Sequence, residues 1–515
     1  MANLDSAIDP AVDPVIEEDM SLSAFFRPPT ANHTFGVLNR ALFNKTVTLA
    51  GAAVTDKKKI AQWRNQLQKD NTLITAERVP AVVFHPNATL AEKGARCILL
   101  DPKVRPDVRD TWSPLIRDAV QKQELDVIPY KLILDYDFWT YEDVMRCLLP
   151  PELRDEHDGF PSGFNQAGHI AHLNLRERYL PYKKLIAEVL VDKNPKVTTV
   201  INKIADVGAE SEFRTFNYEV LAGSDDLKVE ARENESVYSF DYAKVYWNSK
   251  LEAEHRRIAW ETFKPGEAVC DLMAGIGPFA IPAARRGVFV WANDYNPESY
   301  RFLKKNIERN KVSQWVRPFN EDGRVFIRKA ADLVYEASVK GEEATIDIKK
   351  LRRASDAAEK KPQQQQQKTD KNKTKNSISP QKRKKRVPVP PTISHFVMNL
   401  PGSATTFLPH FRGLYAGRED LFEPHPGGAK LPLIHVYGFV VKTEGSDQAT
   451  ELCERISAEL GATITPGADP ENTPGVASVY LVRAVAPKKD MFCASFRIPA
   501  EVAFAPSPVE GGESK

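Results

Sequence analysis

The chain has 515 residues and a net charge of +2, with 42% hydrophobic and 27% charged residues. This length exceeds one compact core and predicts about two to four domains of ordinary globular composition. No apolar run approaches the ~18 residues of a membrane-spanning helix, so we expect no membrane partner. The five cysteines form no Cys-x-x-Cys pair, which argues against a disulfide scaffold and a zinc site and favours a reducing compartment.

The charge is distributed unevenly along the chain. Residues 359–386 contain eleven basic and two acidic residues, a local charge of +9 that leaves about −7 for the remainder. A glutamine run adjoins these basic residues, and we predict a disordered insert over residues 356–391. Its Lys-Arg-Lys-Lys-Arg segment at 382–386 is either a solvated run, a nuclear localisation signal or an RNA tether.

Strand and helix patterns predict three domains between two tails. Residues 1–21 are acidic, lack arginine and do not resemble a secretory signal or mitochondrial presequence, so we expect a flexible tail. The run KTVTLAGAAV (45–54) and a later helical stretch indicate an N-terminal α/β domain over 22–150. A charged, Pro/Gly-rich linker precedes a middle α/β domain over 160–246, and residues 501–515 read as a second tail.

The third domain, over residues 247–500, alternates predicted strands with predicted helices from residue 267 onwards. That rhythm is typical of a doubly wound, Rossmann-like parallel sheet. Such a sheet tolerates the insert at a surface loop because the entropy of loop closure grows only logarithmically with length. The sequence therefore predicts an α/β fold.

A glycine turn marks the first candidate site. The segment Asp271-Leu-Met-Ala-Gly275-Ile-Gly277 lies between a strand and a helix, where glycines allow close approach of a ligand and the helix offers free amides. The next strand ends at Asp294, whose carboxylate can accept both ribose hydroxyls of an adenosine. A dinucleotide site or a plain tight turn also fits. Asp271 would repel a pyrophosphate, and Pro278 lacks an amide donor, so we favour S-adenosylmethionine.

Two further strand ends carry polar residues. Asp322 and Gly323 follow a third strand and either reach an adenine edge or form an ordinary turn. Asn399 ends the strand in HFVMNLP, and Pro401 forces Leu400 to be extended, which directs the Asn399 amide toward a ligand at the strand ends. The alternative is that Asn399 caps the following helix.

Together, seven stretches resemble the eukaryotic and archaeal tRNA (guanine-N1-)-methyltransferases that modify guanosine 37, beside the anticodon. The stretches are GFNQAGHIAHLNLRE, FRTFNYEVLAG, YWNSKLEAEHRRI, DLMAGIGPFAIPA, NDYNPESYRFLKKNI, MNLPGSATTFL and VRAVAPKKDMFCASFRIP. They cover most of residues 160–330 and 392–500. The resemblance implies a class I methyltransferase domain, a middle domain and an N-terminal domain that checks the tRNA body.

The resemblance also implies roles for individual residues. Its catalytic carboxylate falls on Glu254, its guanine-directed arginine on Arg214, and its Asn-Pro-Pro-Tyr-like motif on Asn399-Leu-Pro. Its cofactor contacts fall on His255, Asp294, Tyr295, Asp322, Gly323 and Asn399. Archaeal members tend to have Ser-Pro-Arg-Leu where this chain has Asn248-Ser-Lys-Leu, and here His255 follows the glutamate.

The implied chemistry agrees with these residue types. Guanine N1 carries a proton, and a carboxylate that removes it as general base contributes typically ~10²–10⁴-fold. Negative charge then develops on O6, where a guanidinium stabilises it. The guanosine must leave its stack to reach the site, and the reaction needs no metal. Taken alone, Glu254 would read as a solvated helix residue and Arg214 as a charge on the surface of a strand.

Several alternatives remain open. A related aminocarboxypropyltransferase of the wybutosine pathway uses the same cofactor, and a non-catalytic tRNA-binding module or a nicotinamide dehydrogenase could share the fold. His169 and His172 have the spacing of a metal pair but lack a nearby third ligand, so packing or RNA contact is the preferred reading. We expect a monomer that binds the anticodon loop and body of tRNA. By resemblance, we expect it in cytoplasm and nucleus with a mitochondrial pool.

Overall fold

The computed structural model describes residues 25–29, 33–153, 160–204, 213, 217–347, 384–443 and 445–506. The predicted N-terminal tail, Arg214 and residues 356–383 of the insert lie outside these ranges. The chain divides into two compact units. The first unit contains residues 1–163, 174–200 and 221–223, and the second contains residues 164–173, 201–220 and 224–515. The predicted middle domain is therefore shared between the two units.

The first unit contains a four-stranded sheet with the order β2-β3-β1-β4, in which all neighbours are antiparallel. Its strands are β1 (Lys45–Val54), β2 (Val82–Phe84), β3 (Arg96–Leu99) and β4 (Leu125–Leu134). Strand β1 coincides with the predicted KTVTLAGAAV run, whose apolar residues are buried. Trp63 and Leu67 from α2 (Ile60–Lys69) and Ile116 from α4 (Pro114–Gln121) join the same core.

The described residues of this unit also form α3 (Ala88–Glu92), α5 (Tyr141–Leu148) and α6 (Lys183–Lys193). Helix α5 begins with a capping box, in which Thr140 and Asp143 each satisfy the other's backbone amide. The short 3₁₀ helices of the first unit are η1 (Arg40–Phe43), η2 (Lys57–Lys59), η3 (Arg109–Thr111), η4 (Tyr136–Phe138), η5 (Pro151–Leu153) and η6 (Glu177–Tyr182). Strands β7 (Thr199–Lys203) and β8 (Tyr218–Ala222) lie where the chain passes between the units.

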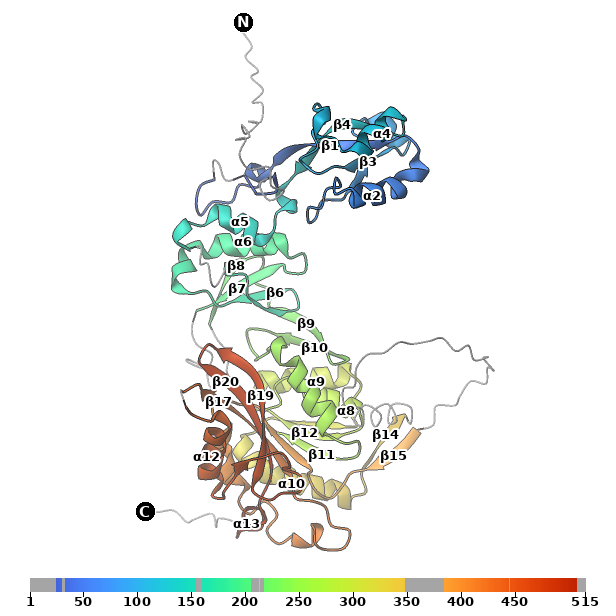
Figure 1. Cartoon of the computed structure of the whole chain (residues 1–515). Coiled ribbons are helices and arrows are strands. Elements are labelled where there is room, and N and C mark those ends of the chain that lie inside the picture. The colour runs from blue at the N-terminus through green and yellow to red at the C-terminus, as the bar shows by residue number, and fades with distance from the viewer. Residues whose placement is uncertain are drawn as a thin grey trace, which may run out of the picture. The chain divides into compact units, whose positions relative to one another are not determined.

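The second unit is built on an eight-stranded sheet with the order β13-β12-β11-β16-β17-β20-β19-β18 (Figure 1). Its strands are β11 (Ala268–Asp271), β12 (Phe289–Asn293), β13 (Val316–Phe319), β16 (His395–Met398), β17 (Leu433–Val441), β18 (Thr465–Pro466), β19 (Val476–Ala486) and β20 (Lys489–Arg497). The first five strands in the sheet order are parallel, and β20 is antiparallel to β17 and β19. This confirms the predicted doubly wound class I methyltransferase sheet.

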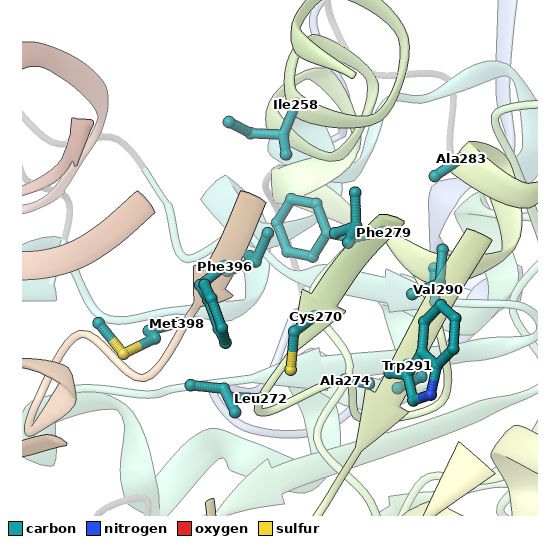
Figure 2. Packing of buried hydrophobic residues seen from close by; sticks show 14 of the residues in the cluster. Ile258, Cys270, Leu272, Ala274, Phe279, Ala283, Val290, Trp291, Phe396 and Met398 are labelled. Atoms are coloured by element: carbon teal, nitrogen blue, oxygen red, sulfur yellow. The ribbon is translucent and has the colours of Figure 1, made fainter. Parts of the chain in front are cut away.

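In the described part of the chain, four helices pack on this sheet: α8 (Ala280–Arg285), α9 (Pro297–Arg309), α10 (Gly323–Val339) and α12 (Gln448–Leu460). The central strands are buried on both faces and are apolar except at one end of each, as expected for parallel strands covered on both sides. Figure 2 shows Cys270 from β11, Phe396 from β16 and Trp291 from β12 within this core, with Phe279 and Ala283 from the α8 region. The packing fixes the carboxyl ends of the strands, where a ligand site is expected.

The remaining described elements of the second unit are short. The strands are β5 (Asn165–Ala167), β6 (Ile170–Leu173), β9 (Lys228–Glu233), β10 (Ser236–Asp241), β14 (Glu343–Asp347) and β15 (Lys384–Pro388). The helical segments are η7 (Ser249–Leu251), α7 (Glu252–Arg256), η8 (Arg257–Thr262), η9 (Ala404–Phe411), η10 (Glu419–Leu421) and α13 (Ala500–Ala503). Within the described residues, no helix combines the length and apolarity needed to cross a membrane.

Two predicted boundaries are wrong. Residues 384–388 were assigned to the disordered insert but form β15, which pairs with β14 and is followed by the buried Val389. Residues 501–506 were assigned to the C-terminal tail but include the last three residues of α13, and the buried Val502 and Ala503 accept amides from Gly413 and Tyr415. In both cases apolar residues next to polar sequence find partners that are distant along the chain.

Candidate methyltransferase site

A pocket with a cavity volume of about 390 Å³ lies at the carboxyl ends of four neighbouring strands. Residues 272–276 follow β11, residues 294–296 follow β12, residues 322–324 follow β13, and residues 399–400 follow β16. The chain order reverses between β11 and β16, which is the topological switch point where doubly wound sheets bind ligands. A cavity of this size suits a cofactor of nucleoside dimensions.

The glycine turn after β11 separates into two parts with different functions. Gly275 lines the pocket at φ +55°, and a Cβ atom there would meet no atom within 4 Å. Gly277 does not line the pocket, although it was predicted to bind cofactor. Its φ is +100°, and a Cβ atom would lie 2.9 Å from Ile281 and Leu303 side-chain carbons. Gly275 is therefore open to a ligand, and Gly277 allows α8 and α9 to pack against the turn.

Asp294 lines the pocket directly after β12, as predicted. Its two carboxylate oxygens accept backbone amides from Gly275 at 2.7 Å and Asn296 at 3.0 Å. These bonds lock the carboxylate at the pocket wall. The neighbouring Tyr295 also lines the pocket, and its side chain is half exposed, with the Phe213 ring centroid 5.8 Å away.

Asp322 and Gly323 line the pocket at the beginning of α10. The Asp322 carboxylate caps this helix by accepting the Arg324 amide at 2.8 Å. A Cβ atom at Gly323 would lie 3.1 Å from the Phe407 ring, so this glycine lets α10 approach the opposite wall. The helix cap formed by Asp322 agrees with the prediction of an ordinary turn. The position of Asp322 and Gly323 in the pocket wall agrees with the prediction of a cofactor contact.

Asn399 lines the pocket after β16, and its Oδ1 is buried without a hydrogen-bond partner. The following helix η9 has Ser403 as its N-cap residue and receives no side-chain cap, so the alternative that Asn399 caps it is wrong. A buried carbonyl oxygen without a donor costs free energy that a ligand N–H or O–H can recover. This orphaned acceptor is the observation in the pocket that points most directly to a missing polar ligand.

Asp271, at the end of β11, is completely buried, and both of its carboxylate oxygens lack a well-formed hydrogen bond. Burial and the nearby Asp294 raise the pKa of Asp271 to about 8, while the Met273 amide opposes the shift. The residue itself does not line the pocket, but Leu272 and Met273 do. A cation placed beside Asp271 would restore its charged form, and the ammonium group of a bound amino acid is one such cation.

A helical segment of mixed geometry forms another wall of the pocket. It passes from the 3₁₀ turn η7 through the α-helical turn α7 to the π-helical turn η8, a form often found at functional sites. His255 from α7 lines the pocket, and its Nδ1 lies 2.5 Å from Glu233 Oε1. This contact, in which Nδ1–H donates to the Glu233 carboxylate, fixes the orientation of the imidazole ring at the pocket wall.

Glu254, from the same turn, is buried with only 4% of its surface exposed, so the reading as a solvated helix residue is wrong. Arg257 donates from Nε to Oε2 at 2.6 Å and from Nη2 to Oε1 at 2.7 Å. The Tyr437 hydroxyl donates to Oε1 at 2.6 Å. A carboxylate has about four lone-pair sites, so three are occupied and one remains for a further donor. Glu254 does not itself line the pocket, but Leu251 and His255 on either side of it do.

Arg214 lies outside the described residues. His172 bonds to the Tyr242 hydroxyl and His169 to the Asp226 carbonyl, and no group of three or more metal-ligating side chains occurs in the described ranges. Sequence reasoning missed several aromatic wall residues of the pocket: Phe213, Tyr246, Trp247 and Phe407. The aromatic run Tyr-Trp before Asn248 was the available signal.

Asn293, at the last position of β12, was also missed. Its amide donates to the Leu272 and Glu321 carbonyls at 3.2 and 2.9 Å and accepts the Glu321 amide at 2.9 Å. It thereby ties together the ends of β11, β12 and β13 beneath the pocket. The sequence shows an asparagine at the end of a predicted strand, but the complete burial that distinguishes Asn293 is known only from the fold.

Curated relatives match almost the whole chain. A tRNA (guanine(37)-N(1))-methyltransferase of Neurospora crassa is 53% identical over 94% of this chain and 95% of the relative. Enzymes of the same name from Schizosaccharomyces pombe and Saccharomyces cerevisiae are 40% and 37% identical, each over 92% of this chain and 96% and 95% of their own lengths. The chain belongs to the tRNA (guanine(37)-N(1))-methyltransferase family.

Family models match two parts of the chain, and solved structures show the same fold. Residues 229–355 match the TRM5/TYW2 methyltransferase domain, and residues 143–226 match the TYW2 N-terminal domain. The fold is similar to that of Trm5b from Pyrococcus abyssi, with a TM-score of 0.52 and 20% identity over 87% of this chain and 99% of that one. It is equally similar to aTrm5 solved with tRNALeu, with a TM-score of 0.53 and 19% identity over 87% and 100%.

Proposed function

We propose that this protein transfers the methyl group of S-adenosylmethionine to N1 of guanosine 37 in tRNA. The observation that carries the proposal is the pocket at the switch point, with the unpartnered Asn399 oxygen at one wall and the locked Asp294 carboxylate at another. Full-length relatives that bear the name of this activity support it.

The residues of the pocket fit the proposed cofactor. Asp294 offers carboxylate lone pairs to ribose hydroxyls, Gly275 leaves open space at the turn, and Asp322 with Gly323 lies at the third strand end. Asp271 is a buried carboxyl group without a well-formed hydrogen bond, suited to an amino acid ammonium. S-adenosylmethionine supplies a sulfonium-bound methyl group when it is bound. The residues of the protein then have to orient the guanine and remove the N1 proton.

We propose that Glu254 removes the guanine N1 proton as the general base. Arg257 and Tyr437 fix its carboxylate and leave one lone-pair site free, so the group is held in one orientation. Fixing a base before the reaction avoids reorganisation during it. Asn399 would grip the N–H or carbonyl edge of the guanine with its amide, and Arg214 would stabilise the charge that develops on O6.

The aminocarboxypropyl transfer of the wybutosine pathway remains the rival chemistry, because the matched family models bear the name TYW2 as well as TRM5. The cofactor and the fold do not distinguish the two reactions. The full-length relatives named as methyltransferases favour methyl transfer. We further propose that the protein acts as a monomer without metal, in cytoplasm and nucleus with a mitochondrial pool.

Incubation of the protein with unmodified tRNA and S-adenosylmethionine, followed by nucleotide-resolved mass spectrometry, tests this function. We expect 1-methylguanosine at position 37 and no product on a transcript with adenosine at that position. An aminocarboxypropyl adduct would establish the rival chemistry. Cofactor binding without any modified nucleoside would favour the non-catalytic tRNA-binding module.

A further inference from the structure

Two titratable side chains, Glu233 and His255, form a buried pair at the wall of the pocket. His255 Nδ1 lies 2.5 Å from Glu233 Oε1, and the two side chains are 3% and 2% exposed. The other carboxylate oxygen, Oε2, is buried without a hydrogen-bond partner in the described part of the chain. A carboxylate is costly to bury unless a counter-charge or a full set of donors accompanies it, so this pair calls for an explanation.

Glu233 is delivered to the pair by the tight turn between β9 and β10. It is the last residue of β9, and the next two residues, Asn234 and Glu235, have left-handed backbone conformations with φ +45° and +59°. The Asn234 side-chain amide donates to the Glu252 carbonyl on α7 at 3.1 Å and to Glu233 Oε1 at 3.3 Å. The turn is therefore attached to the helix that carries His255.

Helix α9 holds the free edge of the same hairpin. Asn306 Oδ1 accepts the backbone amide of Ser239, on β10, at 2.8 Å. Asn310 accepts the backbone amide of Val237 at 3.0 Å and donates to its carbonyl at 2.8 Å. These side chains take the place of a neighbouring strand along β10. Glu233 is thus fixed by contacts to α7 and to α9, as a residue that supports a binding site should be.

The pocket contains nitrogen groups that no part of the described chain satisfies. The Glu233 contact occupies Nδ1 of His255, and Nε2 has no hydrogen-bond partner within the described ranges. Trp247 also lines the pocket, and its indole Nε1 is buried without a partner there. A buried indole N–H is a donor only, so its burial calls for an acceptor from a ligand.

The position of His255 indicates which part of the cofactor it meets. Its ring packs edge-on against Phe279, at a centroid distance of 4.8 Å, and Phe279 follows the glycine turn that begins after Asp271. The ribose and adenine are assigned to the ends of β12 and β13, so the amino acid part of the cofactor lies beside β11. Its carboxylate group would lie near Asp271 and Asp294, and it therefore needs a positively charged donor.

We propose that Glu233 is a positioning residue that acts through His255 to bind the carboxylate of the cofactor's amino acid group, and the proposal rests on the proposed function. Nδ1–H donates to Glu233 and Nε2–H donates to the ligand, so the imidazole is protonated at both nitrogens and carries a positive charge. The Glu233 carboxylate supplies the counter-charge and holds the ring in one orientation. Asp271 and His255 then bind the two opposite charges of one amino acid group.

Equilibrium titration with two ligands tests the proposal without measuring methyl transfer. The ligands are S-adenosylmethionine and decarboxylated S-adenosylmethionine, which lacks only the carboxylate. We expect wild type to bind the decarboxylated ligand at least about tenfold more weakly, the value of one charge-assisted hydrogen bond. E233Q should bind S-adenosylmethionine about tenfold more weakly than wild type does, and the decarboxylated ligand within about twofold of wild type. H255N should show the same selective loss.

The matched control is E235Q, because Glu235 lies on the same turn but is exposed. E235Q should bind both ligands as wild type does. Unfolded protein in a sample of E233Q would lower the apparent binding of both ligands alike, so the ratio of the two affinities reports on the carboxylate alone.

Equal losses for the two ligands in E233Q would overturn the proposal, because a general structural role predicts them. A wild type that binds both ligands equally, or an E233Q that keeps the wild-type ratio, would overturn it as well. These outcomes are separate from those for the proposed function. A wild type that methylates guanosine 37 and shows no preference for the carboxylate overturns this inference alone, whereas a wild type that binds neither ligand contradicts the proposed function.

Discussion

The second unit buries two carboxyl groups beside the same pocket, and only one of the two receives well-formed hydrogen bonds. Glu254, on α7, receives three hydrogen bonds from Arg257 and Tyr437. Asp271, at the end of β11, receives no well-formed hydrogen bond and has its pKa raised to about 8. Both are almost inaccessible to solvent, so burial alone does not explain the difference.

The difference indicates that Glu254 obtains its hydrogen-bond partners from the protein, whereas Asp271 obtains a partner from a bound ligand. A buried carboxylate that is satisfied by its own chain is held in place for repeated use. A buried carboxyl group without partners costs stability that a bound cation returns. We therefore interpret Glu254 as part of the fixed chemical apparatus and Asp271, with the unpartnered Asn399 oxygen, as part of a binding site.

The largest expected effect comes from removing the base. E254Q keeps the size of the side chain and one acceptor oxygen but cannot take up the guanine proton. We expect single-turnover methyl transfer to fall by about 10²–10⁴-fold. Cofactor affinity, measured by equilibrium titration, should stay close to wild type because Arg257 and Tyr437, and not a ligand, satisfy the Glu254 carboxylate.

The control for this variant is E252Q, two residues earlier on the same helix. Glu252 is exposed, and its backbone carbonyl rather than its side chain accepts the Asn234 amide. E252Q should therefore transfer methyl groups at the wild-type rate. Comparable losses in E252Q and E254Q would remove the distinction between a fixed base and an ordinary helix charge.

The next effect concerns the unsatisfied group. D271N cannot ionise, so we expect cofactor affinity to fall by about 10- to 100-fold, the value of one charge-assisted hydrogen bond. In the absence of cofactor, D271N should be more stable than wild type above neutral pH. Because the pKa of Asp271 is raised, the folded wild type holds a proton that the unfolded chain loses, and its stability falls as pH rises from about 4 to about 8.

Thermal melting at two pH values measures this contribution. In wild type without cofactor, the part of stability that comes from Asp271 should be largest at low pH and lost by about pH 8. The variant D271N should lack that part of the pH dependence. A variant with lower stability than wild type at high pH would show that Asp271 has a structural partner.

The two glycines of the turn offer a smaller test of the same contrast between structure and ligand. G277A should destabilise the protein by about 2 kcal/mol, because its backbone has φ +100° and the new Cβ would meet Ile281 and Leu303. G275A has open space around the new Cβ and should destabilise less, while weakening cofactor binding more. Denaturant unfolding and cofactor titration of both variants would contradict this division if the order of either effect were reversed.

The smallest effect is expected from loosening the base. Y437F removes one of the three hydrogen bonds to Glu254 and leaves the Arg257 contacts in place. We expect a loss of about 1 kcal/mol in transition-state stabilisation, seen in kcat and not in the KM for tRNA. A change confined to KM would mean that Tyr437 acts on substrate binding and does not position Glu254.

Local patterns predicted much of the fold and the strand ends of the site. Strand β1 coincides with its predicted run, and Asp294, Asp322 and Asn399 all reach the pocket because parallel strands end at one edge. Their positions depend on periodicity and topology, which the sequence contains. The resemblance to the family added Glu254 and His255, which no local pattern distinguishes from ordinary helix residues.

Contacts between distant parts of the chain could not be predicted in this way. Tyr437 lies 183 positions from Glu254, and only the order of the strands brings the two together. The packing function of Gly277 and the pairing of β15 with β14 likewise depend on neighbours that sequence spacing does not reveal. The unsatisfied state of Asp271 could not be predicted either, because burial without a well-formed hydrogen bond is visible only in three dimensions.

The number of protons released on cofactor binding tests the contrast between the two carboxyl groups most directly. It is measured by titration calorimetry at pH 7 in buffers of different ionisation enthalpy. Because Asp271, with a pKa of about 8, is mostly protonated in the free protein at this pH, a bound ammonium should expel close to one proton from wild type. The same titration of D271N should release about one proton fewer. Equal proton release from wild type and D271N would contradict the assignment of Asp271 to the cofactor.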